Sequence, residues 1–565
     1  MFRCVLSSCL LLLGMTVLSH AQPLPSPPED AVPYWIFLTE RPAPPSPASL
    51  RAADPHAETR RRLRGTAPDA SPLVRPVAPA YVEALRQQGI EVRVQSRWLH
   101  AVSASLTPPQ RVAIAALPFV RDLQPVAQGT NAAPHDASGP QAIRSPVFVS
   151  TPVLPPSVAD SSTYGASYPQ LRMANALAPL ERGIHGEGVR LGFLDTRFRK
   201  FHHPVFDALR ADGRLLKVRD FAGGTQTNNH GGAVASVAVG YAPGTLIGPA
   251  HQAEVLAATT EYTPSERNVE EDYFVAGLEW MEAQGADVVN VSLGYTRFDE
   301  GERSYTTDDL DGDTAITTMA VDAAAQLGMT VVVSAGNSGC ADPASCWFYI
   351  GTPADADSAI AVGGVEPDGS LVGFSSRGPT ADGRTKPDVV ALGRRVVVAW
   401  DTDRFVEAGG TSFASPLVAG VVAQMLQVNP ALRPMQIRTL LRQTADQSTS
   451  PDNKRGWGIL NADAAVHAAT HDARRMPPAE LTVRPPRPSP ARSSTTFTLQ
   501  APDGLSQVDL SLYDLLGRRV HHRTVRVLPG PNRISLSVAS LPPGLYLYRL
   551  KGTDHIATGK LVVLR

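Results

Sequence analysis

The chain has 565 residues, which is too long for one ordinary hydrophobic core, so about two to four domains are expected. A formal net charge of −1 gives no electrostatic reason to expect nucleic acid or an anionic membrane as a partner. With 43% hydrophobic and 19% charged residues, the composition is that of a globular protein rather than a disordered one.

The N-terminus has the pattern of a secretory signal. An arginine near the start precedes an apolar run, residues 5–18, and Ser19 and Ala21 suit a signal-peptidase site. The run is too short and too weakly flanked for a membrane span, and no later stretch has the length and apolarity of one. We therefore expect a signal peptide at residues 1–21 and a protein that is secreted or held at the cell surface after Sec-type export.

Removal of this signal takes away two of the four cysteines and leaves Cys340 and Cys346. Two neighbouring cysteines in an exported protein favour one loop-closing disulfide. A metal site is the alternative, but it would need more ligands than these two.

Residues 22–126 alternate strand-like and helix-like patterns in the order β-α-β-β-α-β, which fits a small two-layer α+β domain. A stretch rich in Pro, Arg and Ala, about residues 42–79, is predicted to be a loop, and the run RRRLR within it to be solvated. Residues 127–159 have the composition of an exposed, cleavable linker.

Residues 160–470 alternate short apolar runs with helical patterns. The runs VRLGFLD, AEVLAAT, ADVVNVSLG, MTVVVSAGN and SAIAVGGV lack period-two alternation, which is typical of strands buried on both faces of a parallel sheet. Helix candidates at 271–285 and 314–328 each end at glycine. We therefore predict an α/β fold with helices on both faces of a parallel sheet. Ligands of such sheets bind outside the carboxyl ends of the strands.

Two segments follow this α/β region. Residues 471–495 form a second linker, rich in Pro and Arg. Residues 496–565 carry alternating patterns separated by Gly/Pro turns, which predict a small β-sandwich. The β-sandwich carries no set of groups that indicates chemistry.

The run GGTSFASPLVAGVVAQML, residues 409–426, has two interpretations. From Ser415 onward nearly every residue is small or apolar, as in a helix packed on all sides. At the start of the run, Thr411 or Ser412 could cap the helix, with glycine giving the entry turn its freedom. Alternatively, Ser412 is a nucleophile held at the positive end of the helix.

A serine nucleophile needs a histidine base, and the histidine works best when a third group orients it. Asp195 directly follows an apolar strand, His230 opens a small-residue helix, and Asn337 sits in a glycine-flanked turn after another strand. Each has an ordinary explanation, as a turn former, a helix-start residue or a left-handed turn residue. With Ser412, however, they are four chemically compatible residues at the kind of place where an active site is built.

The motifs LDTRF, HGGAV, VSLG, SAGN and GGTSFASP, in this order, resemble those of the subtilisin-like serine peptidases (subtilases) over about residues 165 to 470. The resemblance implies a subtilisin-like catalytic domain at 160–470, an inhibitory prodomain at 22–126 and a processing site in the linker at 127–159. The region 496–565 resembles the sorting domain that Bacteroidetes-type bacteria use for type IX secretion. The implied activity is that of a secreted serine endopeptidase acting through an acyl-enzyme intermediate.

The resemblance also implies roles for the four candidate residues. Ser412 would be the nucleophile, His230 the general base and then acid, and Asp195 the group that orients the imidazole. Asn337 would donate its side-chain amide to the oxyanion, together with the backbone N–H of Ser412.

For substrate binding, the resemblance assigns one wall of the first specificity pocket to Ser292, Leu293 and Gly294, on an edge strand that pairs with extended substrate. Ala335 and Gly336 of the SAGN turn would form the opposite wall. Binding along an edge suits peptide, whose free main-chain groups can complete the ladder.

The expected partners are protein or peptide substrates, the chain's own prodomain as an intramolecular inhibitor, and the secretion machinery through the C-terminal domain. No nucleic acid and no membrane span are expected. No cofactor is expected either; calcium is possible from the resemblance, but its ligands are not identifiable. The acidic run at 308–313 fails the EF-hand spacing and is predicted to be a solvated loop.

Three positions depart from the family pattern: Arg197 and Tyr295 replace usual glycines, and Gly232 replaces a usual threonine. Arg197 could distort the turn after Asp195 or reach a carboxylate, and Tyr295 could narrow the pocket. A degenerate subtilase that serves as a surface adhesin is therefore one alternative. A serine esterase of the α/β-hydrolase type is another, but its triad runs Ser, Asp, His, whereas here the order is Asp, His, Ser.

Overall fold

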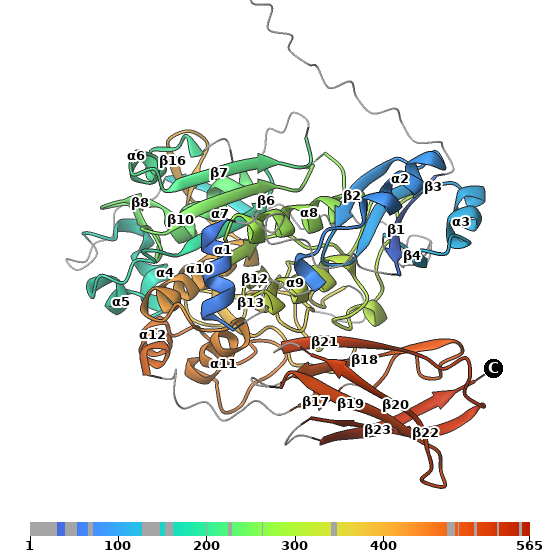
Figure 1. The fold of residues 1–565 in the computed structure, drawn as a ribbon. Helices are drawn as coiled ribbons and strands as arrows, with labels where there is room; N and C mark the ends of the chain where they lie inside the picture. Colours follow the sequence, from blue (N-terminus) through green and yellow to red (C-terminus); the bar gives the residue numbers. More distant parts are fainter. Residues whose placement is uncertain are drawn as a thin grey trace, which may run out of the picture.

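The computed structural model describes residues 31–39, 54–65, 72–126, 147–152, 162–198, 201–223, 229–262, 264–340, 347–471, 481–483, 485–501, 505–527, 530–552 and 556–564. The predicted signal peptide at 1–21 and Cys346 lie outside these residues. Figure 1 shows an N-terminal set of strands in blue, a large central region from green to orange, and a C-terminal set of strands in red.

A seven-stranded sheet runs through the central region, and every pairing in it is parallel. In spatial order its strands are β14 (Val389–Leu392), β13 (Ile360–Val365), β12 (Thr330–Ser334), β11 (Val288–Val291), β6 (Arg190–Asp195), β10 (Glu254–Thr259) and β7 (Leu215–Asp220). The five interior strands are the five runs expected from the sequence. The two edge strands, β7 and β14, were not among those runs.

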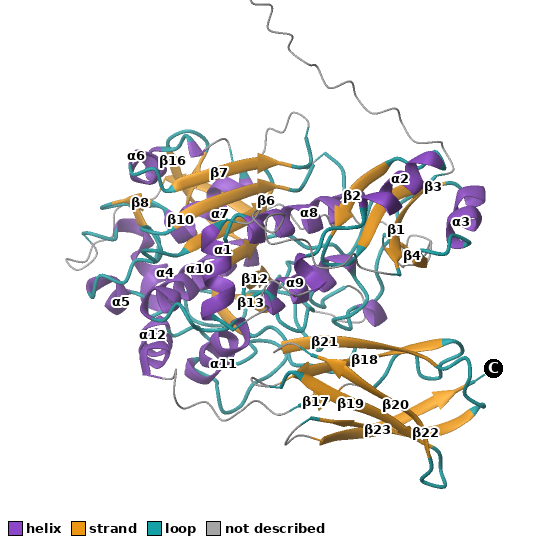
Figure 2. Ribbon diagram, viewed as in Figure 1, coloured by secondary structure: helices purple, strands orange, loops and turns teal. Residues whose placement is uncertain are grey.

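Helices cover both faces of this sheet, as Figure 2 shows. One face carries α7 (His230–Val239) and α10 (Thr411–Val428), and the other carries α8 (Val269–Ala283) and α9 (Ile316–Gln326). Strand side chains alternate between two hydrophobic clusters: Phe193 and Val332 pack with α7 and α10, whereas Leu194 and Val331 pack with α8 and α9. The predicted α/β fold with helices on both faces is confirmed.

Helix α10 is the core helix of this region. The expectation that no stretch after the signal has the length and apolarity of a membrane span is wrong for α10, the one described helix that has both. However, 89% of its apolar window is buried inside the protein. Helices α11 (Pro434–Thr444) and α12 (Ala462–His471) pack beside it. The remaining described α-helices and strands of the central region are α4 (Tyr168–Met173), α5 (Leu177–Glu181), α6 (Asp207–Ala211), β8 (Tyr241–Ala242), β9 (Leu246–Ile247), β15 (Val396–Trp400) and β16 (Arg404–Gly409).

The N-terminal region is a four-stranded antiparallel sheet with the order β2-β3-β1-β4. Its elements in chain order are β1 (Val32–Leu38), α2 (Pro79–Gln87), β2 (Val92–Ser96), β3 (Ala101–Leu106), α3 (Pro108–Ala115) and β4 (Val120–Pro125), which is the predicted β-α-β-β-α-β order. The sheet packs on α8, and Trp35, Phe37 and Trp98 join the same hydrophobic cluster as Phe274 of that helix.

The prediction of a loop at about residues 42–79, with a solvated RRRLR run, is wrong for residues 55–64. Residues Pro55–Leu63 form an additional helix, α1, and Arg60, Arg61 and Arg64 are buried rather than solvated. Their partners are acidic residues of the central region, which a pattern-based prediction from the local sequence could not identify.

The C-terminal region consists of two antiparallel sheets around one hydrophobic cluster, as expected for a β-sandwich. One sheet holds β17 (Thr482–Val483), β18 (Ser494–Ala501) and β21 (Gly530–Ser537), and the other β20 (Arg519–Arg526), β19 (Gln507–Tyr513), β22 (Gly544–Lys551) and β23 (Ile556–Val563).

The acidic run at 308–313 is not simply a solvated loop. Asp313 accepts hydrogen bonds from Thr498 (2.6 Å) and from Arg533 Nε (2.9 Å) of the β-sandwich. Arg487 approaches Asp311 to 3.5 Å, and Asp311 is itself buried. The run therefore forms part of the contact surface for the C-terminal region, because its carboxylates meet arginines from a part of the chain far away in sequence.

A buried ion cluster ties β14 to helix α11. The carboxylate of Asp388 accepts hydrogen bonds from Lys386 Nζ (3.0 Å), Arg442 Nε (2.8 Å) and the backbone N–H of Ala361 (2.7 Å). Burial opposes ionisation of Asp388, but Arg442 and Lys386 outweigh it and hold the pKa below its usual value. The negative charge of Asp388 therefore compensates Arg442 and Lys386, although burial lowers the pKa of Lys386 to about 7.

We predict that Asp388→Ala lowers the free energy of unfolding by about 3–5 kcal/mol, because it leaves buried positive charge without a partner. Urea denaturation followed by tryptophan fluorescence measures this, since Trp457 stacks under the guanidinium of Arg442 at 3.8 Å. Glu300→Ala, at an exposed carboxylate, is the matched control and is expected to leave the midpoint nearly unchanged. Equal urea midpoints for the two variants would contradict the proposed contribution of this cluster to the free energy of unfolding.

Candidate active site

The predicted catalytic side chains come from one edge of the central sheet. Asp195 is the last residue of β6, and Asn337 follows closely after the end of β12. Helices α7 and α10, which pack against each other, begin at this edge with His230 and with Thr411 followed by Ser412. Because all strands are parallel, their carboxyl ends meet at one edge, where ligands of such sheets bind.

The structure brings Asp195 and His230 into direct contact. His230 Nδ1 lies 2.6 Å from Asp195 Oδ1, and both side chains are buried. The same carboxylate oxygen accepts the backbone N–H of Thr196 at 2.7 Å, which fixes its position. Arg197 is exposed, and the contact between Asp195 and His230 is present despite this departure from the family pattern.

Two glycines follow His230, and the first of them allows this approach. A Cβ at Gly231 would lie 2.9 Å from the ring of Phe198 and 3.1 Å from Cβ of Asp195. A Cβ at Gly232, where the family usually has threonine, would lie 2.7 Å from the side-chain oxygen of Asn229. The absent side chain at Gly231 therefore lets the start of α7 lie against the end of β6, whereas the one at Gly232 leaves room for Asn229.

Ser412 is the second residue of α10 and is 1% exposed. The ring of the next residue, Phe413, packs against the ring of His230 with centroids 5.6 Å apart. The prediction that Thr411 or Ser412 caps this helix is wrong, because the N-cap position is Gly410 and carries no side-chain cap. Gly410 has φ 153°, a conformation that favours glycine.

The missing cap comes from Asn337 instead. The backbone N–H of Thr411 donates to Asn337 Oδ1 at 2.9 Å, and the Thr411 hydroxyl donates to the same oxygen at 2.9 Å. An N–H donor needs an acceptor, so these contacts identify Oδ1 and turn the Nδ2 amino group to the other side. Asn337 thus satisfies an N-terminal N–H of α10 and still has two N–H donors to offer.

A chain of hydrogen bonds that the sequence did not suggest holds the start of α10 against β11. Asn290 Nδ2 donates to Ser292 Oγ at 3.0 Å, and Ser292 Oγ donates to the backbone carbonyl of Ser412 at 2.8 Å. Ser415 Oγ donates back to Asn290 Oδ1 at 2.7 Å. Asn290 and Ser415 lie inside apolar runs. The one feature of the sequence that could have identified them is a polar residue within an apolar run.

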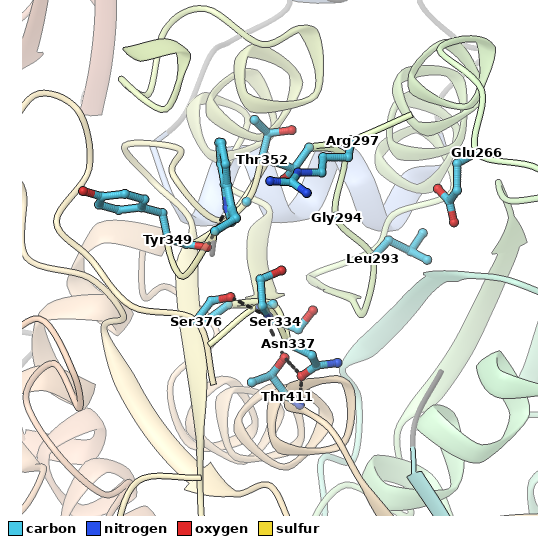
Figure 3. A pocket seen from close by; sticks show the side chains of 16 residues that line it. Glu266, Leu293, Gly294, Arg297, Ser334, Asn337, Tyr349, Thr352, Ser376 and Thr411 are labelled. Atoms are coloured by element: carbon cyan, nitrogen blue, oxygen red, sulfur yellow. Dashed lines mark hydrogen bonds between the residues drawn. The ribbon is translucent and has the colours of Figure 1, made fainter. Parts of the chain in front are cut away.

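A pocket of about 660 Å³, counting its solvent-open mouth, lies beside these residues (Figure 3). Four of the five predicted substrate-binding residues line it: Leu293, Gly294, Ala335 and Gly336. Ser292 is not among the lining residues and instead faces α10. Asn337 and Thr411 also line the pocket, which connects it to the start of α10.

The segment expected to be an edge strand is placed differently. Strand β11 is an interior strand whose pairing ends at Val291, and pairing resumes only at Tyr295, which bridges to Thr352. Residues 292–294 therefore extend beyond the carboxyl end of an interior strand. Tyr295 does not narrow the pocket, because its ring is buried against Phe274 and its hydroxyl bonds to Glu261.

Aromatic and charged side chains complete the pocket. Trp347 and Tyr349 line it together with Arg297, whose guanidinium lies 5.8 Å from the centre of the Trp347 ring. In Figure 3, Glu266 lies at the end of the pocket opposite to Tyr349. Cys340, just past the pocket residue Ser338, is disulfide-bonded, and its predicted pairing with Cys346 stays a prediction because Cys346 lies outside the described residues.

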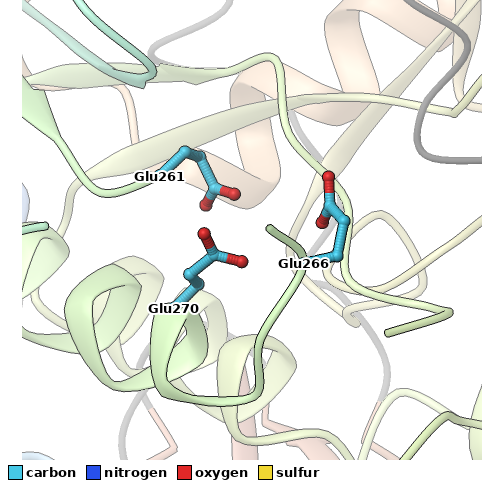
Figure 4. Close-up of side chains that lie close together, drawn as sticks. All are labelled: Glu261, Glu266 and Glu270. Carbon is cyan, nitrogen blue, oxygen red and sulfur yellow. The ribbon is translucent and has the colours of Figure 1, made fainter. Parts of the chain in front are cut away.

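Three glutamates, Glu261, Glu266 and Glu270, have carboxylate oxygens within 4.8 Å of one another (Figure 4). The two oxygens of Glu270 accept the backbone N–H groups of Tyr262 (2.8 Å) and Arg267 (2.9 Å). Burial is the main cause that raises the pKa of Glu270 to about 8 and that of Glu266 to about 7. Because protein hydrogen bonds already organise this cluster, and Ca²⁺ takes six to eight oxygen ligands, we assign no ion to it.

Three family models match the chain. A model of the subtilase family matches residues 186–458, one of the Bacteroidota peptidase S8 propeptide domain matches residues 33–140, and one of the secretion system C-terminal sorting domain matches residues 488–564. The last model corresponds to the type IX sorting domain expected from the sequence.

Subtilisins are similar to the central region over nearly their whole length. Subtilisin DY of Bacillus licheniformis is 31% identical over 294 residues, which is 50% of this chain and 93% of that protein. Subtilisin Savinase of Lederbergia lenta is 31% identical over 293 residues, 52% of this chain and 95% of that protein. The solved structure of the prenylagaramide maturation protease PagA aligns with a TM-score of 0.41 at 23% identity, over 52% of this chain and 98% of that one. On the sequence similarity to the two subtilisins and the matching family models, the chain belongs to the subtilase family of serine peptidases.

Proposed function

We propose that the protein hydrolyses peptide bonds of proteins through an acyl-enzyme intermediate, with Asp195, His230 and Ser412 as its triad and Asn337 in its oxyanion hole. The observation that carries the proposal is the 2.6 Å contact between Asp195 Oδ1 and His230 Nδ1, at the start of the helix that packs against α10. The sorting domain makes this a secreted or cell-surface enzyme. We also propose that residues 1–21 are a signal peptide that directs export of the protein.

In this mechanism, the bond to Asp195 occupies Nδ1 of His230 and leaves the Nε2 side of the ring to take the proton of Ser412. Ser412 Oγ attacks the substrate carbonyl, and His230 then returns the proton to the leaving amine. Water then takes the place of the amine and attacks the acyl-enzyme. His230 accepts a proton from this water and returns it to Ser412 Oγ as the acyl group leaves. The buried position of Asp195 suits this role, since a charged carboxylate there stabilises the imidazolium that forms.

Asn337 and the start of α10 support the oxyanion. The Nδ2 group of Asn337 is the half of the amide not used by Thr411. The backbone N–H of Ser412 and the positive end of α10 would add to the same stabilisation. Substrate would lie extended between Leu293 and Gly294 on one side and the turn of Ala335 and Gly336 on the other, since all four residues line the pocket.

The linker expected to be cut passes close to this site. Within it, β5 (Val147–Pro152) pairs antiparallel with β16, and Val147 lies opposite Gly409. Gly409 is three residues before Ser412 in the chain. This pairing supports self-processing between about Ala127 and Thr163, with the prodomain acting as an intramolecular inhibitor until it is released.

We predict that a fluorophosphonate probe labels the wild-type protein on Ser412 and that Ser412→Ala is neither labelled nor self-processed. Mass spectrometry of the labelled peptide and of the precursor measures both effects. An unlabelled wild-type protein would favour the adhesin alternative. A purified Ser412→Ala protein that still matures alone would refute self-processing.

We predict that Asn337→Ala lowers turnover by roughly 10²–10³-fold while KM changes little, because an oxyanion donor acts mainly in the transition state. That magnitude is the one known for an oxyanion asparagine in subtilisin itself. Steady-state kinetics on a peptide substrate separates kcat from KM. Because Asn337 also caps α10, the melting temperature is measured alongside; a weaker KM with unchanged kcat would contradict the assignment.

We predict a pH-dependent preference for cationic substrate side chains at the Glu266 end of the pocket. Burial, with a smaller contribution from Asp299, raises the pKa of Glu266 to about 7, so its negative charge appears as the pH rises through that value. The ratio of kcat/KM for a lysine peptide to that for its glutamine analogue should therefore rise from pH 6 to pH 8. The catalytic step is common to both peptides, so its own pH dependence cancels in the ratio. Glu266→Gln should flatten the profile, and an unchanged slope would contradict this role.

A further inference from the structure

Helix α1 lies at the edge of the central sheet opposite to the active site. Its acidic partner Asp287 directly precedes β11, whereas Ser292 directly follows that strand. The chain before α1 is fixed at the same edge, because the N–H of Asp54 donates to the carbonyl of Ala283 at 2.9 Å and Asp54 pairs with Arg190, the first residue of β6. Figure 1 shows α1 over the central region, apart from the strands of the N-terminal sheet.

Three arginines converge on the carboxylate of Glu282, at the end of α8. Arg61 binds it through Nε (2.9 Å) and Nη2 (2.7 Å to Oε2), and Arg97, just after β2, binds Oε2 at 2.7 Å. Arg60 is the third partner. The side chains of Glu282 and Arg60 are completely buried. Burial opposes ionisation of Glu282, but the arginines outweigh it and lower its pKa, so these contacts are ion pairs at neutral pH.

A second group of contacts centres on Asp287. Arg64 Nη2 donates to Asp287 Oδ1 at 2.9 Å, and His56 Nε2 lies 2.7 Å from Oδ2. Burial raises the pKa of Asp287, but Arg64 and His56 outweigh it and hold the pKa at about 2. Arg64 Nε also donates to the carbonyl of Pro430 at 3.2 Å, beyond the end of α10.

The local sequence of α1 favours a helix, since Asp54 caps it, Pro55 opens it and arginines occupy its last turn, but these signals alone do not stabilise so short a helix. The helix has nine residues, and isolated helices of that length are marginal in water. Ala57 is its only buried apolar residue, while Arg60 and Arg61 are buried through their ion pairs. The acidic surface of the catalytic region therefore holds this segment in its helical form.

We propose that Glu282 and Asp287 form a second prodomain-binding site of the catalytic domain, specific for an arginine-rich helical segment, and that residues 54–65 occupy it. We call it the arginine site. It lies away from the catalytic cleft, so cutting the linker leaves its contacts intact. Together with the prodomain sheet on α8, it makes the prodomain a two-point ligand whose second contact is favoured by a high effective concentration. The prodomain therefore stays bound after processing, and release from the arginine site limits the appearance of activity.

The first test uses the full chain carrying Ser412→Ala, so that no processing intervenes. Adding Arg61→Ala and Arg64→Ala should increase amide hydrogen exchange across residues 55–63 by at least about 30-fold, the effect of truncating a buried charged pair. The matched control is Arg62→Ala, an exposed arginine of the same helix, which should leave exchange unchanged. Protection elsewhere in the chain reports whether each variant has folded. Unchanged exchange in the double variant would overturn the proposal.

The second test uses the chain with its serine intact and follows the delay between linker cleavage, seen on gels, and peptidase activity. The Arg61→Ala/Arg64→Ala variant should shorten the delay at least tenfold, whereas Arg62→Ala should not change it. Faster exchange with an unchanged delay would overturn retention by this site. If the peptidase proposal itself fails, no chain becomes active, and the exchange measurement still decides whether the arginine site exists.

Discussion

The parallel direction of the central strands is the constraint on which the rest of the structure depends. Parallel strands place all their carboxyl ends at one edge and all their amino ends at the other. Asp195, Ser292 and the turn of Asn337 therefore share one edge, although Asp195 and Asn337 lie 142 residues apart in the sequence. The same geometry places Arg190 and Asp287, which precede two of these strands, at the opposite edge.

The start of α10 shows how one helix end can serve structure and chemistry together. Helix N-termini carry backbone N–H groups without partners inside the helix. Here the carbonyl half of the Asn337 amide satisfies Thr411, and the amino half is left for another acceptor. Ser292 anchors the Ser412 carbonyl, so the serine is held from the strand as well as from its own helix. A single amide thus positions the helix and supplies the donors proposed for the oxyanion.

Charge binds the two flanking regions to the catalytic region in different ways. On the prodomain side, the carboxylate of Glu282 is completely buried and meets three arginines, so removal of one partner leaves a buried charge and is costly. On the sorting-domain side, the side chains of Arg487 and Arg533 are 54% and 34% exposed, and such pairs contribute little individually. The prodomain contact is therefore the specific one, whereas the sorting domain is joined by weaker ionic contacts.

The sequence by itself determined the α/β class, the five interior strands, the prodomain topology and the β-sandwich, because apolar periodicity is a local property of the chain. It also singled out Asp195, His230, Asn337 and Ser412, since motif order and strand-end position can be read along one dimension. Only the tertiary structure decided that Asn337 caps α10, that residues 292–294 extend from an interior strand, and that Arg60, Arg61 and Arg64 are buried. Each of these depends on a partner distant in sequence, and whether an arginine is solvated or buried is decided by the carboxylate that the fold places opposite it.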